Sequence, residues 1–202
     1  MRLDILEKVC NIIIEKKEEL TELDRVIGDG DHGVNLSRGM EKVKEELPKL
    51  EGLKPFEVLN KCAMLLMSNV GGASGALYAT ALMKGAAALK GKEEITSEDI
   101  SKAWNDMILG IESRGKSAKG EKTMLDTLIP AYEAFKREVE AGKDVKSAFS
   151  SAEEAGKLGM ESTKDMVATK GRATYLGERS VGHIDAGATS SYLIIKTIAE
   201  NL

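Results

Sequence analysis

The sequence repeats one pattern, a stretch of helical periodicity followed by a short break that often contains glycine. Apolar residues recur three and four positions apart, as on one face of a helix. Only three prolines occur in 202 residues, and Ala, Leu, Lys, Glu and Met favour helix. These features predict one all-α domain over residues 1–202, with no convincing strand. The eight expected helices cover about 3–24, 33–46, 55–69, 75–90, 97–114, 125–140, 145–168 and 188–201.

Four of the breaks contain most of the residues suited to chemistry. They are 24–35, 71–75, 115–124 and 171–187, which are the first, third, fifth and seventh connections between the expected helices. In an up-and-down arrangement, alternate connections lie at the same end of the molecule. We therefore expect an antiparallel helical bundle with a single polar site, formed by these four loops at one end.

The first break contains three aspartates within eight residues, Asp24, Asp29 and Asp31. Glycines among them permit the tight turns that would bring three carboxylates to one point. Hard oxygen ligands suit Mg²⁺, Ca²⁺ or Mn²⁺ rather than zinc or copper. An EF-hand is excluded, because counting from Asp29 places Met40 at the twelfth position, where a glutamate belongs. The glycine spacing and the companion breaks favour a divalent-cation site over a solvated acidic turn.

The other breaks suit a phosphate-bearing ligand. The runs 71–75 and 187–190 each begin a helix with small residues, so backbone N–H groups and a hydroxyl can reach an anion. Arg172 and Arg179 add fixed positive charge. Three carboxylates and a diphosphate carry about six negative charges, and two divalent cations with one arginine return about five. We therefore expect two metal ions. Neither the P-loop nor the dinucleotide-binding glycine fingerprint is present.

Several classes of protein are disfavoured. The net charge of −4 gives no indication of a nucleic-acid partner. No run approaches the ~18 apolar residues that would cross a membrane, and the N-terminus has no secretory pattern. Cys10 and Cys62 each lie in an apolar helical pattern and are expected to be buried, free thiols. These observations predict a cytoplasmic protein.

Four motifs, taken together, resemble the nucleotide-binding subunit of dihydroxyacetone kinases, the DhaL type. The similarity extends over essentially the whole chain. It implies an eight-helix antiparallel barrel with the nucleotide at one end. The motifs are Leu-Asp with Gly-Asp-Gly-Asp-His-Gly-Val-Asn at 23–35, Gly-Gly-Ala-Ser-Gly at 71–75, Ser-Arg-Gly with Lys-Thr-Met at 113–124, and Lys-Gly-Arg through Asp-Ala-Gly-Ala-Thr-Ser at 170–190.

The resemblance implies roles for individual residues. Asp24, Asp29 and Asp31 would ligate two Mg²⁺ ions that bridge the phosphates of ADP or ATP. Arg172 would be catalytic, facing the phosphoryl group in transfer. His32 as a general base is disfavoured. The positions that match nucleotide contacts in the family are His32, Gly33, Val34, Asn35, Ala73, Ser74, Gly115, Thr123, Met124, Arg172, Asp185, Ala186 and Gly187.

The resemblance also implies partners. A separate kinase subunit would hold dihydroxyacetone, an intermediate of glycerol metabolism, covalently through a histidine. In the form that depends on the phosphotransferase system, ADP stays bound and a phosphohistidine donor protein recharges it. Some members also signal to a transcription regulator. Ala76, Gly120-Glu121 and Ala186 depart from the usual pattern, so the phosphoryl donor is open between ATP and a phosphoprotein.

Two alternative functions remain at this stage. One is an ATP-dependent kinase subunit for another small keto-sugar or for a bound fatty acid. The run Asp-His-Gly-Val-Asn at 31–35 weighs against the fatty acid, because that relative usually has Asp-Thr-Gly-Thr-Asn. The other is a nucleotide-binding regulatory module without chemistry of its own.

Overall fold

The computed structural model describes residues 2–202, so Met1 of the predicted domain lies outside the described residues. The described chain is helical and contains no strand, and this confirms the predicted all-α class. Two 3₁₀ turns, η1 (Leu47–Leu50) and η2 (Thr163–Asp165), and the longer 3₁₀ segment η3 (Arg172–Ser180) lie between helices. The α-helices are α1 (Leu3–Glu15), α2 (Lys17–Ile27), α3 (His32–Glu46), α4 (Pro55–Asn69), α5 (Gly72–Leu89), α6 (Ser97–Gly115), α7 (Leu125–Glu140), α8 (Val145–Ser162) and α9 (Ala186–Glu200).

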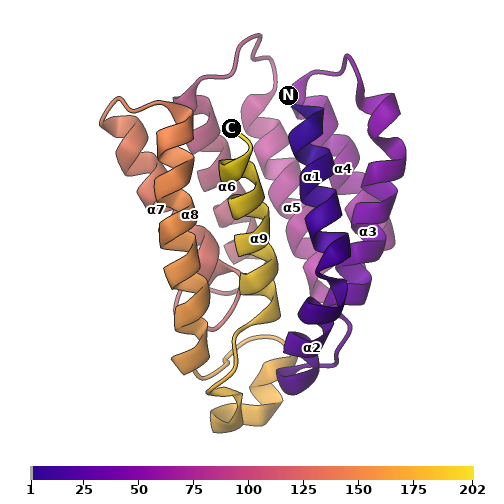
Figure 1. Cartoon of the computed structure of the whole chain (residues 1–202), viewed down its shortest axis with the longest axis vertical. Coiled ribbons are helices and arrows are strands. Elements are labelled where there is room, and N and C mark those ends of the chain that lie inside the picture. Colours follow the sequence, from indigo (N-terminus) through magenta and orange to yellow (C-terminus); the bar gives the residue numbers. More distant parts are fainter. Residues whose placement is uncertain (1) are drawn as a thin grey trace.

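The helices run up and down and form a closed ring (Figure 1). From α3 to α9 each helix packs on the next one in the chain, and α1 packs on both α3 and α9. The ring therefore closes through α1, as a barrel requires. Across residues 2–202, none of the helices is both long enough and apolar enough to cross a membrane.

Apolar side chains fill the inside of the ring. On the side of α6, α7 and α8 the filling is aromatic, with Phe135 and Phe149 edge to face at a centroid distance of 4.9 Å. Trp104 stacks on Phe149 at 5.7 Å. Such pairs contribute about 0.5–1.5 kcal/mol beyond their buried area. Elsewhere the core is aliphatic and includes Ile13, Leu20, Leu36, Leu50, Val58, Leu66, Ile111 and Leu125.

Two predicted helix boundaries differ from the structure. The helix expected at 3–24 is divided at Lys16, whose φ of −86° and ψ of 10° leave the helical region. The helix expected to reach 168 ends at Ser162, where the chain tightens into η2. The predicted caps are confirmed: Thr96 and Asp99 form a capping box at α6, and Asp144 accepts a hydrogen bond from the backbone N–H of Ser147 at α8.

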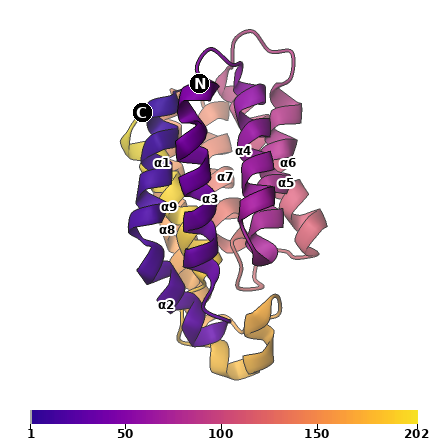
Figure 2. The same cartoon turned by 90° about the vertical axis from the view of Figure 1, so that its right-hand side faces the viewer.

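The four breaks gather at one end of the ring, opposite the two termini. Figures 1 and 2 show the α2–α3 connection and η3 at this end. The second and third breaks lie close to these segments. A Cβ placed on Gly72, in the second break, would lie 3.9 Å from Oδ1 of Asp31 in the first. A Cβ on Gly187, in the fourth break, would lie 3.7 Å from the backbone nitrogen of Met124 in the third. The arrangement expected from alternating connections is therefore the one observed.

Candidate functional site

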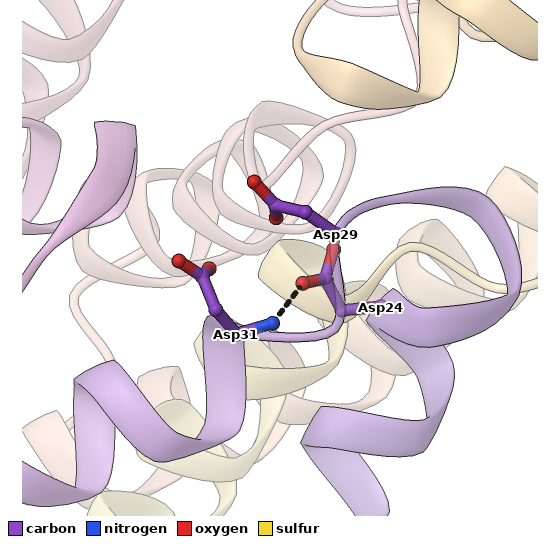
Figure 3. A group of neighbouring side chains, drawn as sticks. All are labelled: Asp24, Asp29 and Asp31. Atoms are coloured by element: carbon purple, nitrogen blue, oxygen red, sulfur yellow. Dashed lines mark hydrogen bonds between the residues drawn. The ribbon is translucent and has the colours of Figure 1, made fainter.

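The three aspartates of the first break converge. Asp24 lies in the last turn of α2, Asp29 in the connection, and Asp31 at the N-cap of α3. One carboxylate oxygen from each lies within 4.8 Å of the others. Figure 3 shows the side chains of Asp29 and Asp31 on the same side of the loop, with Asp24 beside them. Three oxygen donors at this spacing fit a hard divalent cation.

Backbone hydrogen bonds hold this loop in place. Oδ2 of Asp24 accepts from the N–H group of Asp31 at 2.8 Å (Figure 3). It also accepts from the N–H group of His32 at 3.1 Å. Asp24 thus satisfies two N–H groups at the start of α3, which have no partner within the helix. A Cβ on Gly28 would lie 2.1 Å from Oδ1 of Asp24, so only glycine fits there. Gly30 has a φ of +72°, a conformation that favours glycine.

The cluster carries more negative charge than its surroundings offset. Partial burial, together with the negative charge of Asp29, raises the pKa of Asp31. Nε of Arg172, on η3, lies 3.1 Å from Oδ2 of Asp29, with the two side chains 69% and 45% exposed. An ion pair this exposed contributes at most about 1 kcal/mol. One guanidinium therefore leaves two carboxylates uncompensated, as a cation site requires.

The second break, at the start of α5, faces the cluster. Gly71 is the N-cap of α5, and a Cβ on it would lie 3.0 Å from Oδ1 of the buried Asn35. The same oxygen of Asn35 accepts from Nη2 of Arg38 at 2.8 Å. Ala73 is exposed and Ser74 is half-buried. The N–H groups of this helix start lie beside the carboxylates, where an anion bound to the same cations could reach them.

Hydrogen bonds from two buried charged side chains hold the third break in place. Lys122 is 2% exposed, and its Nζ donates to the backbone carbonyls of Thr163 and His183. Burial lowers the pKa of Lys122. Asp126 is equally buried and accepts from the backbone N–H of Thr123 at 2.8 Å. Both side chains were missed as site residues. The partners of Lys122 are carbonyls 41 and 61 positions away, whereas Asp126 binds N–H groups only three and six positions away.

The fourth break is fixed by Asp185. Its Oδ2 accepts from the N–H of Ala188 at 2.8 Å, so Asp185 caps α9. Its own N–H donates to Oγ1 of Thr163 at 3.0 Å. Burial raises the pKa of Asp185 to about 6, although the Ala188 hydrogen bond and Lys122 act in the opposite direction. Asp185 therefore has a structural task, whatever it contacts in a ligand.

His32 links the start of α3 to α9. It is buried at the start of α3, and its Nε2 lies 2.9 Å from Oγ of Ser190 on α9. Burial lowers the pKa of His32. Oγ of Ser190 in turn lies 2.8 Å from the hydroxyl of Tyr78 on α5. Tyr78 was not among the predicted site residues.

Some predicted contact residues lie in the packing instead of at the surface of the site. Gly33 faces α2, and a Cβ there would lie 2.1 Å from the carbonyl oxygen of Lys17. Met124 and Ala186 are buried. Val34 is 41% exposed, and Gly115, at the end of α6, is half-buried. Ligand contacts of these residues remain predictions.

An open hollow of about 350 Å³ adjoins the cluster, between the end of α2 and η3. Tyr175 on its rim is 81% exposed. Asp29 and Arg172 both line this hollow and are accessible from it. Its lining is Arg25, Val26, Ile27, Gly28, Asp29, Arg172, Tyr175 and Leu176.

Residues 26–200 match the model of the DAK2 domain. The chain belongs to the DAK2 domain family. Within it, the chain is 40% identical to the ADP-binding subunit DhaL of the PEP-dependent dihydroxyacetone kinase of Escherichia coli, over 96% of this chain and 92% of that protein. It is also 40% identical to the ADP-binding subunit DhaL of the PTS-dependent dihydroxyacetone kinase of Lactococcus lactis, over 96% and 93%. The predicted resemblance to the DhaL type is confirmed.

Solved structures share the helical fold of this chain. The dihydroxyacetone kinase of C. freundii matches with a TM-score of 0.78 in its native form and 0.74 in complex with AMP-PNP and Mg²⁺. The sequence identities are 21% and 22%. Both matches cover 98% of this chain but only about a third of the C. freundii protein, 34% and 33%. The structures confirm the fold, and the sequence relatives, which are dihydroxyacetone kinase subunits, confirm the predicted class of a kinase subunit.

Proposed function

We propose that this chain is the ADP-binding subunit of a dihydroxyacetone kinase that depends on phosphoenolpyruvate through the phosphotransferase system. In this role it passes a phosphoryl group to dihydroxyacetone held on a partner subunit. The near full-length similarity to DhaL subunits supports the assignment. The observation that carries it is the convergence of Asp24, Asp29 and Asp31 beside Arg172. In this proposal the substrate site lies on the partner subunit.

In the proposed mechanism the three aspartates would hold two Mg²⁺ ions, which would offset the negative charge of the nucleotide phosphates. N–H groups at the start of α5 bind phosphate oxygens. Arg172 stabilises the charge on the phosphoryl group in transfer, because its guanidinium can approach that group from η3 while Asp29 orients it. Positioning and electrostatics supply most of the catalysis in such transfers. The chain therefore needs no general base.

The partners are proposed to dock at the open end of the ring. Arg172 and Tyr175 project from η3 with most of their surface exposed, so a substrate-bearing subunit can reach the phosphoryl group. A phosphohistidine donor protein would use the same opening to recharge ADP. We assign the complex to the cytoplasm, where Cys10 and Cys62, both free and buried, would stay reduced.

The metal assignment is tested by Asp29→Ala. Calorimetry should show at least about tenfold weaker binding of Mg·ADP, since even an outer partner of a metal ligand contributes about 10- to 100-fold to affinity. Asp4→Ala is the matched control, because Asp4 pairs with Arg2 at 2.6 Å at the opposite end. Equal Mg·ADP affinity in the two variants would refute the assignment.

The role of Arg172 is tested by Arg172→Ala in an assay with the substrate-binding subunit and the phosphoryl donor. We expect turnover to fall by about 10²–10³-fold, as for the loss of a donor to transition-state charge. Mg·ADP affinity should fall by less than about fivefold, because the exposed pair with Asp29 is weak. Arg2→Ala should change neither quantity. A loss of affinity as large as the loss of turnover contradicts the transfer role.

A further inference from the structure

A chain of buried hydroxyl groups connects three helices behind the aspartate cluster. The hydroxyl of Tyr78 lies 3.0 Å from Oγ of Ser191 and 2.8 Å from Oγ of Ser190. Ser190 reaches Nε2 of His32 at 2.9 Å. All four side chains are at most 9% exposed. Buried polar groups in such a chain fix one another's orientation, because each has few partners.

The hydrogen-bond partners set the direction of the chain. The proton of Ser190 can go to the carbonyl of Gly187, 3.1 Å away, or to Nε2 of His32. That carbonyl lies in the first turn of α9 and already accepts the helical hydrogen bond from the N–H of Ser191. Of its two acceptors, Nε2 of His32 is the nearer, at 2.9 Å against 3.1 Å, which favours donation from Ser190 to His32. Ser190 then accepts from Tyr78, which accepts from Ser191.

The other nitrogen of His32 is left for a ligand. A neutral imidazole has one donor nitrogen and one acceptor nitrogen. If Nε2 accepts from Ser190, Nδ1 carries the proton. Within residues 2–202, Nδ1 makes no hydrogen bond, and no fully buried side-chain nitrogen or oxygen lacks a hydrogen-bond partner. Nδ1 is therefore not fully buried, and His32 directly follows Asp31 in the sequence.

We propose that Tyr78 is a positioning residue which, through Ser190, holds His32 with its proton on Nδ1. The ring then offers an N–H donor, not a lone pair, to an anionic oxygen at the aspartate cluster. This inference rests on the proposed function, in which that oxygen belongs to the phosphates of Mg·ADP. Tyr78 itself touches no ligand.

The tautomer can be read directly by NMR. Proteins labelled with ¹⁵N in histidine are studied at pH 8.5, where a histidine of ordinary pKa is neutral. The chain has only two histidines, so His183→Gln assigns the signals. We expect the Nδ1–H form in the wild type and a mixture, or the Nε2–H form, in Tyr78→Phe. Ser190→Ala, which removes the intermediary, must give the same change.

Tyr192→Phe is the matched control, because the Tyr192 hydroxyl donates to Glu153 at 2.7 Å, away from His32. It should leave the His32 tautomer unchanged. Tyr78→Phe should weaken Mg·ADP binding about fivefold, the equivalent of one buried hydrogen bond, and Tyr192→Phe should not. An Nε2–H wild type that binds Mg·ADP, or a tautomer unchanged in Tyr78→Phe, would overturn the inference alone. A wild type with Nδ1–H that fails to bind Mg·ADP would overturn the proposed function, and with it the role of this donor.

Discussion

At the scale of single residues, Asp185 combines two conflicting requirements. Its carboxylate caps α9, which favours the charged form, yet burial raises its pKa to about 6. An unfolded chain ionises an aspartate near pH 4. Between about pH 4 and pH 6 the folded protein therefore holds a proton that the unfolded chain has released. By linkage, the contribution of Asp185 to stability falls as the pH rises through this interval.

We predict that this group lowers the free energy of unfolding of the ligand-free chain by about 1–3 kcal/mol between pH 4 and pH 7. Asp185→Asn, which keeps an oxygen to cap α9, should remove that part of the pH dependence. Urea unfolding at several pH values measures it. Asp144 is the matched control: it caps α8 from an exposed position, and its hydrogen bonds with Ser147 lower its pKa. Asp144→Asn should therefore remove stability that is present above about pH 4. An unaltered pH profile in Asp185→Asn would contradict the account.

Local spacing made some site residues predictable and left others hidden. Asp24, Asp29 and Asp31 lie within one loop, so their convergence follows from glycine turns and short separation. Lys122 reaches carbonyls 41 and 61 positions away, and Tyr78 reaches a serine 112 positions away. Such partners depend on the whole ring and cannot be inferred from neighbours in the sequence.

At the scale of elements, glycine sets how closely α7 and α8 approach. A Cβ on Gly159 would lie 2.1 Å from the backbone carbonyl oxygen of Asp126. Asp126 in turn holds the backbone of Gly120 and Thr123. The helix contact therefore positions the third loop of the site as well as the core.

We predict that Gly159→Ala destabilises the chain by about 1–3 kcal/mol, because the backbone carbonyl cannot move aside without shifting a helix. Gly156→Ala, one turn earlier, is the matched control, since its Cβ would meet side-chain carbons alone, at 3.3 Å (Ala131 Cβ), 3.6 Å (Thr127 Cγ2) and 3.7 Å (Ile195 Cδ1). The gain in helix propensity of about 1 kcal/mol should roughly offset that contact. Thermal unfolding of both variants measures the difference, and equal melting temperatures would argue against close packing at Gly159.

Helix starts were easier to predict than helix interruptions. Caps such as Thr96 and Asp144 act over three residues, so the sequence displays them. The break at Lys16 precedes the turn where Gly33 of α3 meets the carbonyl of Lys17. The end of α8 precedes Thr163, whose backbone and side chain bind Lys122 and Asp185. Both interruptions adjoin contacts from distant elements.

At the scale of the whole molecule, the position of the site depends on the alternation of helix directions. The break at Lys16 does not reverse the chain, because α1 and α2 follow one another along the same side (Figure 1). Had it been a reversal, the later loops would have changed ends and the four breaks would have separated. Alternation was therefore enough to predict one site. It could not predict the hydrogen bonds inside that site.

Because all four loops belong to one closed ring, ligand binding at the open end should stabilise the entire chain. We predict a single unfolding transition, as the assignment of residues 1–202 to one domain requires.

Mg·ADP at about 100 times its dissociation constant should add about 2.7 kcal/mol to the free energy of unfolding, or about 5–10 °C in melting temperature. ADP with EDTA should give little of this shift, because without cations the carboxylates repel the phosphates. Calorimetry with ADP, Mg²⁺, both, and both plus EDTA separates the contributions. Two transitions would refute the single domain, and an equal shift with ADP alone would refute the requirement for metal at Asp24, Asp29 and Asp31.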